Sequence, residues 1–174
     1  MDGSGGIKLE EWLAAHGEEL RRAWLEATAA RYGDVFRHFV RRQPDPFANP
    51  SGAILREGTG RLLTALAEPA DAAVLREVLM PMIRLKAVQD VPPSEALAFV
   101  PLLKELVPAD GADAPSPAAR AELARRLDAL LLVAFDVFVE CRQTVYQLRV
   151  HEMQRNVARL LQREASPTRG GNGR

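Results

Sequence analysis

The spacing of apolar residues predicts that the chain is built from helices. Between Leu9 and Tyr32, apolar residues recur at intervals of three, four or a multiple of these, and charged residues occupy the positions between them. This pattern is typical of an amphipathic helix, which Gly17 interrupts at modest cost and Gly33 ends. A short second helix is expected over residues 35–40, where four apolar residues follow closely.

Prolines and glycines shape the middle of the chain. Residues 43–52, QPDPFANPSG, hold three prolines and predict a rigid extended connector, because a proline disfavours helix in the residue before it. Ser51 can cap a helix that runs to Leu66. Gly58 and Gly60 weaken this helix, which makes sense only if a neighbouring backbone packs very close to it.

Two further helices are predicted before a long loop. The first begins at Asp71, a suitable N-cap, and ends at Leu79, after which Pro81 opens or kinks the next segment. The second begins at Ser94, continues to Leu106 and is kinked at Pro101. Residues 108–117, PADGADAPSP, then form a clear break.

The last segment predicts one long helix, because neither proline nor glycine occurs from Ala118 to Glu164. A helix of about 46 residues spans roughly 69 Å, whereas a globule of this chain length is about 40 Å across. The helix therefore cannot be covered by its own domain. Its first part, ALLLVAFDVFV at 129–139, is apolar nearly all round and predicts a central core helix.

The second part of this helix carries a coiled-coil pattern. Apolar residues alternate spacings of four and three, with Arg149, Glu152, Arg155 and Arg159 beside them. This predicted dimer seam consists of Tyr146, Val150, Met153, Val157 and Leu160. Two heptads are shorter than a typical coiled coil, and the alternative is a helix that bends back or frays. We expect a homodimer that pairs through the seam.

Composition supports an all-α fold in one domain. Ala, Leu, Arg and Glu dominate the 174 residues, and isoleucine occurs only at positions 7, 54 and 83. We expect a single helical sensor or interaction domain at 8–163. The small, polar and glycine-rich ends, 1–7 and 164–174, are expected to be disordered.

Charge and cysteine content exclude several classes of protein. The 23 basic and 23 acidic residues leave no net charge, which disfavours nucleic acid as a partner. Cys141 is the only cysteine, which excludes an internal disulfide and a multi-thiolate metal site and fits a reducing, cytoplasmic compartment. The longest unbroken apolar stretch, Ala129 to Phe135, predicts neither a signal peptide nor a membrane span.

The candidate chemistry is sparse. The histidines at positions 16, 38 and 151 lack the spacing of metal or haem ligands, and we expect them at the surface or boundary. Cys141 is expected to behave as a small buried hydrophobe, with redox sensing as the alternative. No phosphate loop, nucleophile elbow or metalloprotease motif occurs. We therefore expect no enzyme, catalytic residue, metal or cofactor.

Asp136 interrupts the apolar run of the predicted core helix. A buried carboxylate needs a partner or stays protonated. We expect a structural ion pair with Arg84, Lys86 or Arg142 rather than a catalytic acid, because no second acid or nucleophile lies near it in the pattern.

Three stretches together resemble one known family. They are PDPFANPSG at 44–52, IRLKAVQDVPPSEALAF at 83–99 and LLVAFDVFVECRQTVYQLRVHEM at 131–153. The chain resembles the N-terminal domain of RsbRD-type RsbT co-antagonists, which are found in stressosome-related regulators, from about Leu9 to Arg155. The motif positions that this resemblance marks are Arg84, Gln89, Asp90, Asp136, Cys141, Arg142, Arg149 and Glu152.

The resemblance implies a non-haem, globin-like helical bundle that dimerises and carries a long C-terminal helix. Full-length co-antagonists continue into a STAS output domain, which we do not find here. We therefore expect a stand-alone signalling domain that binds proteins, including a STAS-domain protein or a switch kinase, and that can sense a ligand. The alternatives are a haem or gas-sensing globin-like protein, and an accessory or assembly factor for a redox complex of sulfite reduction.

Overall fold

The computed structural model describes residues 7–31, 47–68, 70–89 and 91–165. All regular secondary structure within these ranges is helical, which confirms the all-α prediction. The helices are α1 (Leu9–Ala30), α3 (Pro50–Ala67), α4 (Ala72–Ala87), α5 (Pro93–Ala96), α6 (Phe99–Leu106) and α7 (Pro117–Ala165). The short helix predicted at 35–40, His38 and Asp90 lie outside the described residues.

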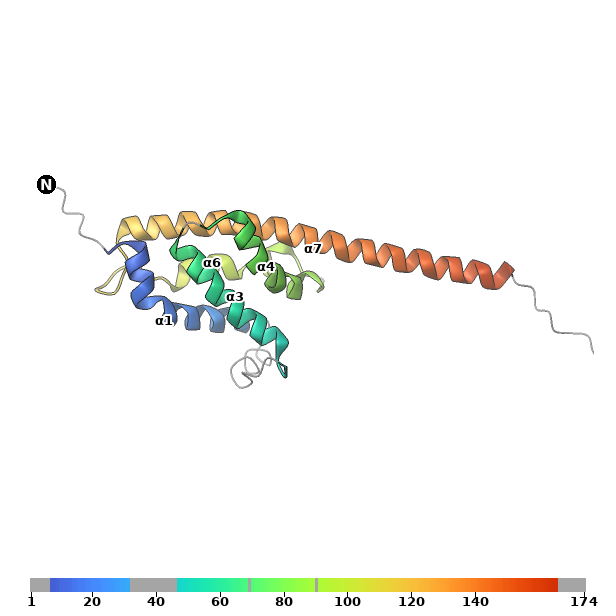
Figure 1. Cartoon of the computed structure of the whole chain (residues 1–174), viewed down its shortest axis with the longest axis horizontal. Helices are drawn as coiled ribbons and strands as arrows, with labels where there is room; N and C mark the ends of the chain where they lie inside the picture. Colours follow the sequence, from blue (N-terminus) through green and yellow to red (C-terminus); the bar gives the residue numbers. More distant parts are fainter. Residues whose placement is uncertain (1–6, 32–46, 69, 90, 166–174) are drawn as a thin grey trace, which may run out of the picture.

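The shorter helices pack together on one side of the first half of α7 (Figure 1). Two tryptophans of α1 lie in this core and are almost completely buried. The Nε1 of Trp24 donates a hydrogen bond to the carbonyl of Phe99 at 2.7 Å. The Nε1 of Trp12 donates to the carbonyl of Asp113 at 2.8 Å. Each indole therefore adds a polar link between α1 and a distant part of the chain to the apolar area that it buries.

Two helix starts confirm or correct the predicted caps. Asp71 caps α4 as predicted, since its carboxylate accepts a hydrogen bond from the Ala73 amide at 3.1 Å. The prediction of Ser51 as the cap of α3 is wrong, because Asn49 accepts from the Gly52 amide at 2.8 Å. Pro50 occupies the first helical position, where its fixed φ and missing amide hydrogen suit a helix start.

The helices around the prolines differ from the prediction. The α4 helix continues through Pro81 to Ala87 instead of ending at Leu79. Buried residues on both sides of Pro81, including Val78 and Met82, hold this helix against the core. Packing therefore offsets the lost hydrogen bond.

The expected helix from Ser94 to Leu106 is two helices. Ser94 lies inside α5, so it is not the cap, and the break falls between Ala96 and Phe99. Pro101 lies in the first turn of α6, where helix amides have no partner within the helix. The expected kink at Pro101 is therefore wrong.

Gly58 lets α3 approach α4 closely. A Cβ atom at Gly58 would lie 2.2 Å from the Sδ atom of Met82, so the neighbour is a buried side chain rather than a backbone. The prediction fails for Gly60, where the nearest atom, Cδ of Arg21, would be 3.6 Å away. The α1 helix also runs through Gly17 without the expected interruption.

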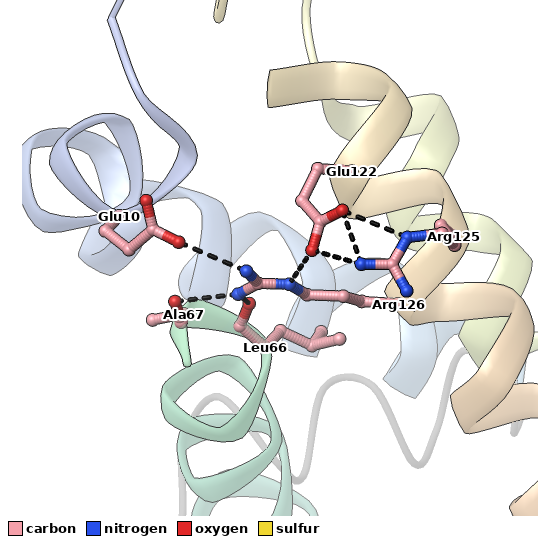
Figure 2. A network of polar contacts seen from close by, with 6 residues as sticks. All are labelled: Glu10, Leu66, Ala67, Glu122, Arg125 and Arg126. Carbon is pink, nitrogen blue, oxygen red and sulfur yellow. Dashed lines mark hydrogen bonds and ion pairs between the residues drawn. The ribbon is translucent and has the colours of Figure 1, made fainter. Parts of the chain in front are cut away.

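Arg126 of α7 fastens the ends of two other helices (Figure 2). Its Nη1 donates to the carbonyls of Leu66 and Ala67 at 2.8 Å each, and thereby satisfies the C-terminal end of α3. Its Nη2 pairs with Glu10 of α1 at 3.1 Å, and its Nε pairs with Glu122 at 2.6 Å. The Arg126 side chain is only 13% exposed, whereas Glu10 is 50% exposed, so this network connects α1, α3 and α7 at the edge of the globule.

Candidate functional site

The α7 helix has a packed half and a projecting half. The buried residues of α7 are Ala119, Leu123, Leu127, Leu130, Ala134, Val137, Phe138 and Cys141. From Tyr146 to Gln162 every residue is exposed. Residues 146–165 therefore extend about 30 Å beyond the last contacts with the globule, and Figure 1 shows this half of α7 alone. The prediction of an unbroken helix that outruns its domain is confirmed.

The predicted dimer seam lies on the projecting half. Its five residues are all large and exposed: Tyr146 at 52%, Val150 at 45%, Met153 at 61%, Val157 at 55% and Leu160 at 60%. Residues at these spacings share one face of a helix. The seam is therefore an apolar face that no part of the described chain covers.

The packed half is not the fully buried core helix that its composition predicts. Leu132, Phe135 and Val139 are 71%, 48% and 36% exposed. Asp136 is also exposed, so the expected burial of this carboxylate is wrong. The reason is that the other helices cover α7 from one side only (Figure 1).

These exposed residues extend the apolar seam toward the globule. An apolar residue recurs at every seventh position, and all five are exposed: Leu132, Val139, Tyr146, Met153 and Leu160. Together with Val150 and Val157 they form what we call the α7 stripe. The heptad pattern predicts only the part of this stripe from Tyr146 onward. The seven-residue spacing also includes Leu132 and Val139, but the apolar composition of residues 129–139 predicts burial all round and hides them.

Arg142 joins the globule to the start of the projecting half. Its Nη1 donates to the carbonyl of Gln89, just beyond the end of α4, at 2.7 Å. Its Nη2 donates to the hydroxyl of Tyr146 at 3.1 Å, and the guanidinium carbon lies 5.3 Å from the centre of the Tyr146 ring. The first residue of the seam is thus held by the same side chain that holds the end of α4.

The other expected partners of Asp136 make different contacts. Lys86 is buried, and its Nζ lies 3.5 Å from a carboxylate oxygen of Glu95. Arg84 is exposed on α4 and lies next to the thiol of Cys141. The structure therefore does not bring the marked motif positions together into one cluster, since Arg149 and Glu152 are exposed on the projecting half.

Cys141 is buried at the junction, by which we mean the part of α7 near Cys141 and Arg142 where the helix leaves the globule. This burial is as expected for an apolar contact. Its Sγ lies 3.5 Å from the Sδ of Met80. Burial raises the pKa of the Cys141 thiol, and the positive charge of Arg84 offsets this effect only in part. The neutral thiol is therefore the favoured form, which fits a packing role.

The histidines within the described ranges lie apart from one another. His16 stacks on Trp12, with ring centres 5.2 Å apart, and His151 is exposed on the projecting half. No group of three or more potential metal ligands occurs in the part of the chain that the structure describes. Among the described helices, none combines the length and apolarity that crossing a membrane requires.

Two hollows flank α7 at the junction. One, of about 480 Å³, lies between Pro92, Pro93 and the face of α7 that carries Phe138 and Arg142. The other, of about 370 Å³, lies between α4 and α7. Both volumes fall within the range of small-molecule sites in proteins.

A comparison with protein families links the packed half of α7 and the globule to one family. The family model described as the N-terminal domain of the RsbT co-antagonist protein rsbRD matches residues 18–153. This is more than half of the 174-residue chain. No curated protein and no solved structure matches the chain. The match includes α3 to α6, the junction at Arg142 and the first half of the seam.

Proposed function

Because the chain belongs to the family of RsbRD N-terminal domains, which are stressosome-type signalling domains, we propose that it is a non-enzymatic regulatory module that binds other proteins through α7. The observation that carries this proposal is the exposed α7 stripe on a helix that leaves its own globule. An apolar surface of this length on a single chain is typical of a protein interaction site.

The first partner is a second copy of this chain. In heptad terms the seam places Val150 and Val157 at a positions, and Tyr146, Met153 and Leu160 at d positions. β-branched residues at a with leucine at d favour parallel two-stranded coiled coils, and this seam has valine at both a positions and leucine at one of its three d positions. A parallel homodimer covers the stripe on both copies and places the two globules at the same end.

The second partner is a downstream protein of the signalling system. We propose that a STAS-domain protein or a switch kinase in the cytoplasm binds the paired α7 helices of this dimer. Family membership supports this proposal. The contact of Arg142 with both the end of α4 and Tyr146 supports it too, since a shift in the globule would reach the paired helices through this side chain.

The experiment that tests the proposal is the oligomeric mass of purified protein by sedimentation equilibrium. We expect a dimer for the natural chain. In Met153→Glu, two glutamates would face each other across the seam, and association should weaken by at least about tenfold. His151→Glu is the matched control, because it places the same residue on the same turn but off the stripe.

The outcomes separate clearly. A dimer that Met153→Glu weakens and His151→Glu preserves supports pairing through the stripe. A monomeric mass at micromolar concentration, or equal effects of the two substitutions, contradicts it. Circular dichroism establishes that both variants keep the helix content of the natural chain.

A further inference from the structure

The hollow between α4 and α7, which we call the α4–α7 groove, has mainly apolar walls. Met80, Ala87 and Val88 line it from the side of α4. Cys141, Val145 and Leu148 line it from α7. The groove spans the point at which α7 loses contact with the globule, because Cys141 is the last buried residue of that helix in the described chain.

The apolar side chains at the mouth of the groove are left exposed. Val88 is 55% exposed and Leu148 is 63% exposed. Leu148 takes heptad position f, which faces away from a partner helix that pairs at a and d. A second copy seated on the α7 stripe therefore leaves Leu148 and the groove uncovered and accessible to a ligand.

The charge at the groove points to an anion. Arg84 forms no ion pair with any carboxylate in the described ranges, and its neighbour in the groove is the thiol of Cys141. The other ionised group in the lining, Glu140, is already paired with Arg76. One guanidinium without a carboxylate partner thus stands beside an apolar channel.

We propose that the α4–α7 groove binds a small amphipathic carboxylate, of the class of free medium-chain fatty acids. Its apolar chain lies between α4 and α7 and covers Val88 and Leu148, and its carboxylate accepts hydrogen bonds from Arg84. Such a ligand fastens the first turns of the projecting half to α4. The binding stands on the groove itself, whereas its role as a signal rests on the proposed function.

Isothermal titration calorimetry with decanoate tests the proposal, with decanol and acetate as probes of the chain and the charge alone. We expect decanoate to bind about tenfold more tightly than decanol, because only the carboxylate pairs with Arg84. Acetate should not bind measurably. Arg84→Gln should remove the advantage of decanoate over decanol, and Arg22→Gln, an exposed arginine of α1, should preserve it.

The single cysteine reports on the location of the ligand. Decanoate should slow the alkylation of Cys141 by iodoacetamide, which mass spectrometry follows without interference because no other cysteine is present. Leu148→Glu places a negative charge on the groove wall and should abolish both binding and protection. Circular dichroism checks that this variant keeps its helices.

Three results would overturn the inference: no binding of decanoate, equal decanoate affinity in Arg84→Gln, or binding that leaves the alkylation rate of Cys141 unchanged. The sedimentation mass of the same samples is measured in parallel. A dimer that fails to bind decanoate contradicts the groove proposal alone, whereas a monomer that binds decanoate contradicts the proposed pairing alone.

Discussion

At the scale of single residues, Gly58 decides how closely α3 can approach α4. A Cβ atom there would meet the Sδ and Cγ atoms of buried Met82 at 2.2 and 2.6 Å. We expect Gly58→Ala to destabilise the fold by about 1–3 kcal/mol through overpacking. Gly60→Ala meets nothing closer than 3.6 Å and should be neutral or stabilising by up to about 1 kcal/mol. Urea unfolding measures both, and equal effects would contradict the close approach.

The Arg126 network gives a second residue-scale prediction. Arg126→Met removes the hydrogen bonds to the carbonyls of Leu66 and Ala67 and should destabilise the fold by about 1–3 kcal/mol. Arg125→Met is the matched control, because Arg125 is 74% exposed and, within the described ranges, pairs only with Glu122 on its own helix. Its urea midpoint should stay near that of the natural chain. A loss of stability that is as large for Arg125→Met would assign the effect to helix α7 alone.

The same network predicts how stability changes with acid. Hydrogen bonds from its own backbone and from Arg126 lower the pKa of Glu10, and those from Arg125 and Arg126 lower the pKa of Glu122. A lowered carboxylate pKa stabilises the fold above the ordinary value of 4.5, and this contribution is lost as the pH falls through the lowered pKa. The urea concentration at the unfolding midpoint should therefore decrease as the pH is lowered below 4.5. In Arg126→Met this midpoint should decrease less steeply. Parallel pH profiles would contradict this.

Residue types predict that a helix start has a capping side chain, but they do not predict which of two suitable neighbours forms the cap. Asp71 is the cap of α4, as its residue type and position indicate. Near α3 both Asn49 and Ser51 are suitable, and Pro50 decides between them because a proline fits the first helical position. Gly58 and Gly60 are equally visible in the sequence. Only the packing of Met82 shows which one is required.

At the scale of elements, α7 shows what a local pattern contains and what it omits. The absence of proline and glycine from Ala118 to Glu164 predicts its continuity, which the structure confirms. The same sequence cannot tell which face of an apolar helix its neighbours cover. Leu132 and Val139 are exposed because the globule packs against only one side of α7. Their seven-residue spacing is the signal that distinguishes an exposed apolar face from a core.

Asp136 provides an element-scale prediction about pairing. It takes heptad position a between Leu132 and Val139, so a parallel pair brings two like charges together. Asp136→Val should tighten the dimer by about tenfold in sedimentation equilibrium. Glu152→Val removes the same charge at position c and should leave association unchanged. An unchanged dimer in Asp136→Val would limit the pairing surface to residues beyond it.

At the scale of the whole molecule, the fold class and the projecting helix follow from sequence, but the α4–α7 groove does not. Arg84 and Leu148 are far apart in the chain and share no local pattern. They become neighbours because α4 continues through Pro81 and lies beside α7 at Cys141. Continuity through a proline depends on tertiary packing, which helix propensity does not contain. The groove is therefore visible only in the assembled structure.

The central claim is that α7 leaves the globule as one helix and pairs in parallel with the α7 of a second copy. Electron–electron distance measurement on a spin label at Gln162→Cys, with Cys141→Ser to remove the natural thiol, tests it most directly. Gln162 takes heptad position f, which faces away from the partner helix, and lies near the end of the projecting half. A parallel pair in register therefore predicts one narrow separation of about 20–30 Å, whereas an antiparallel pair centred on the seam shifts the two labels apart along the axis by about 27 Å more. The absence of a defined separation, or one well beyond this range, would contradict the claim.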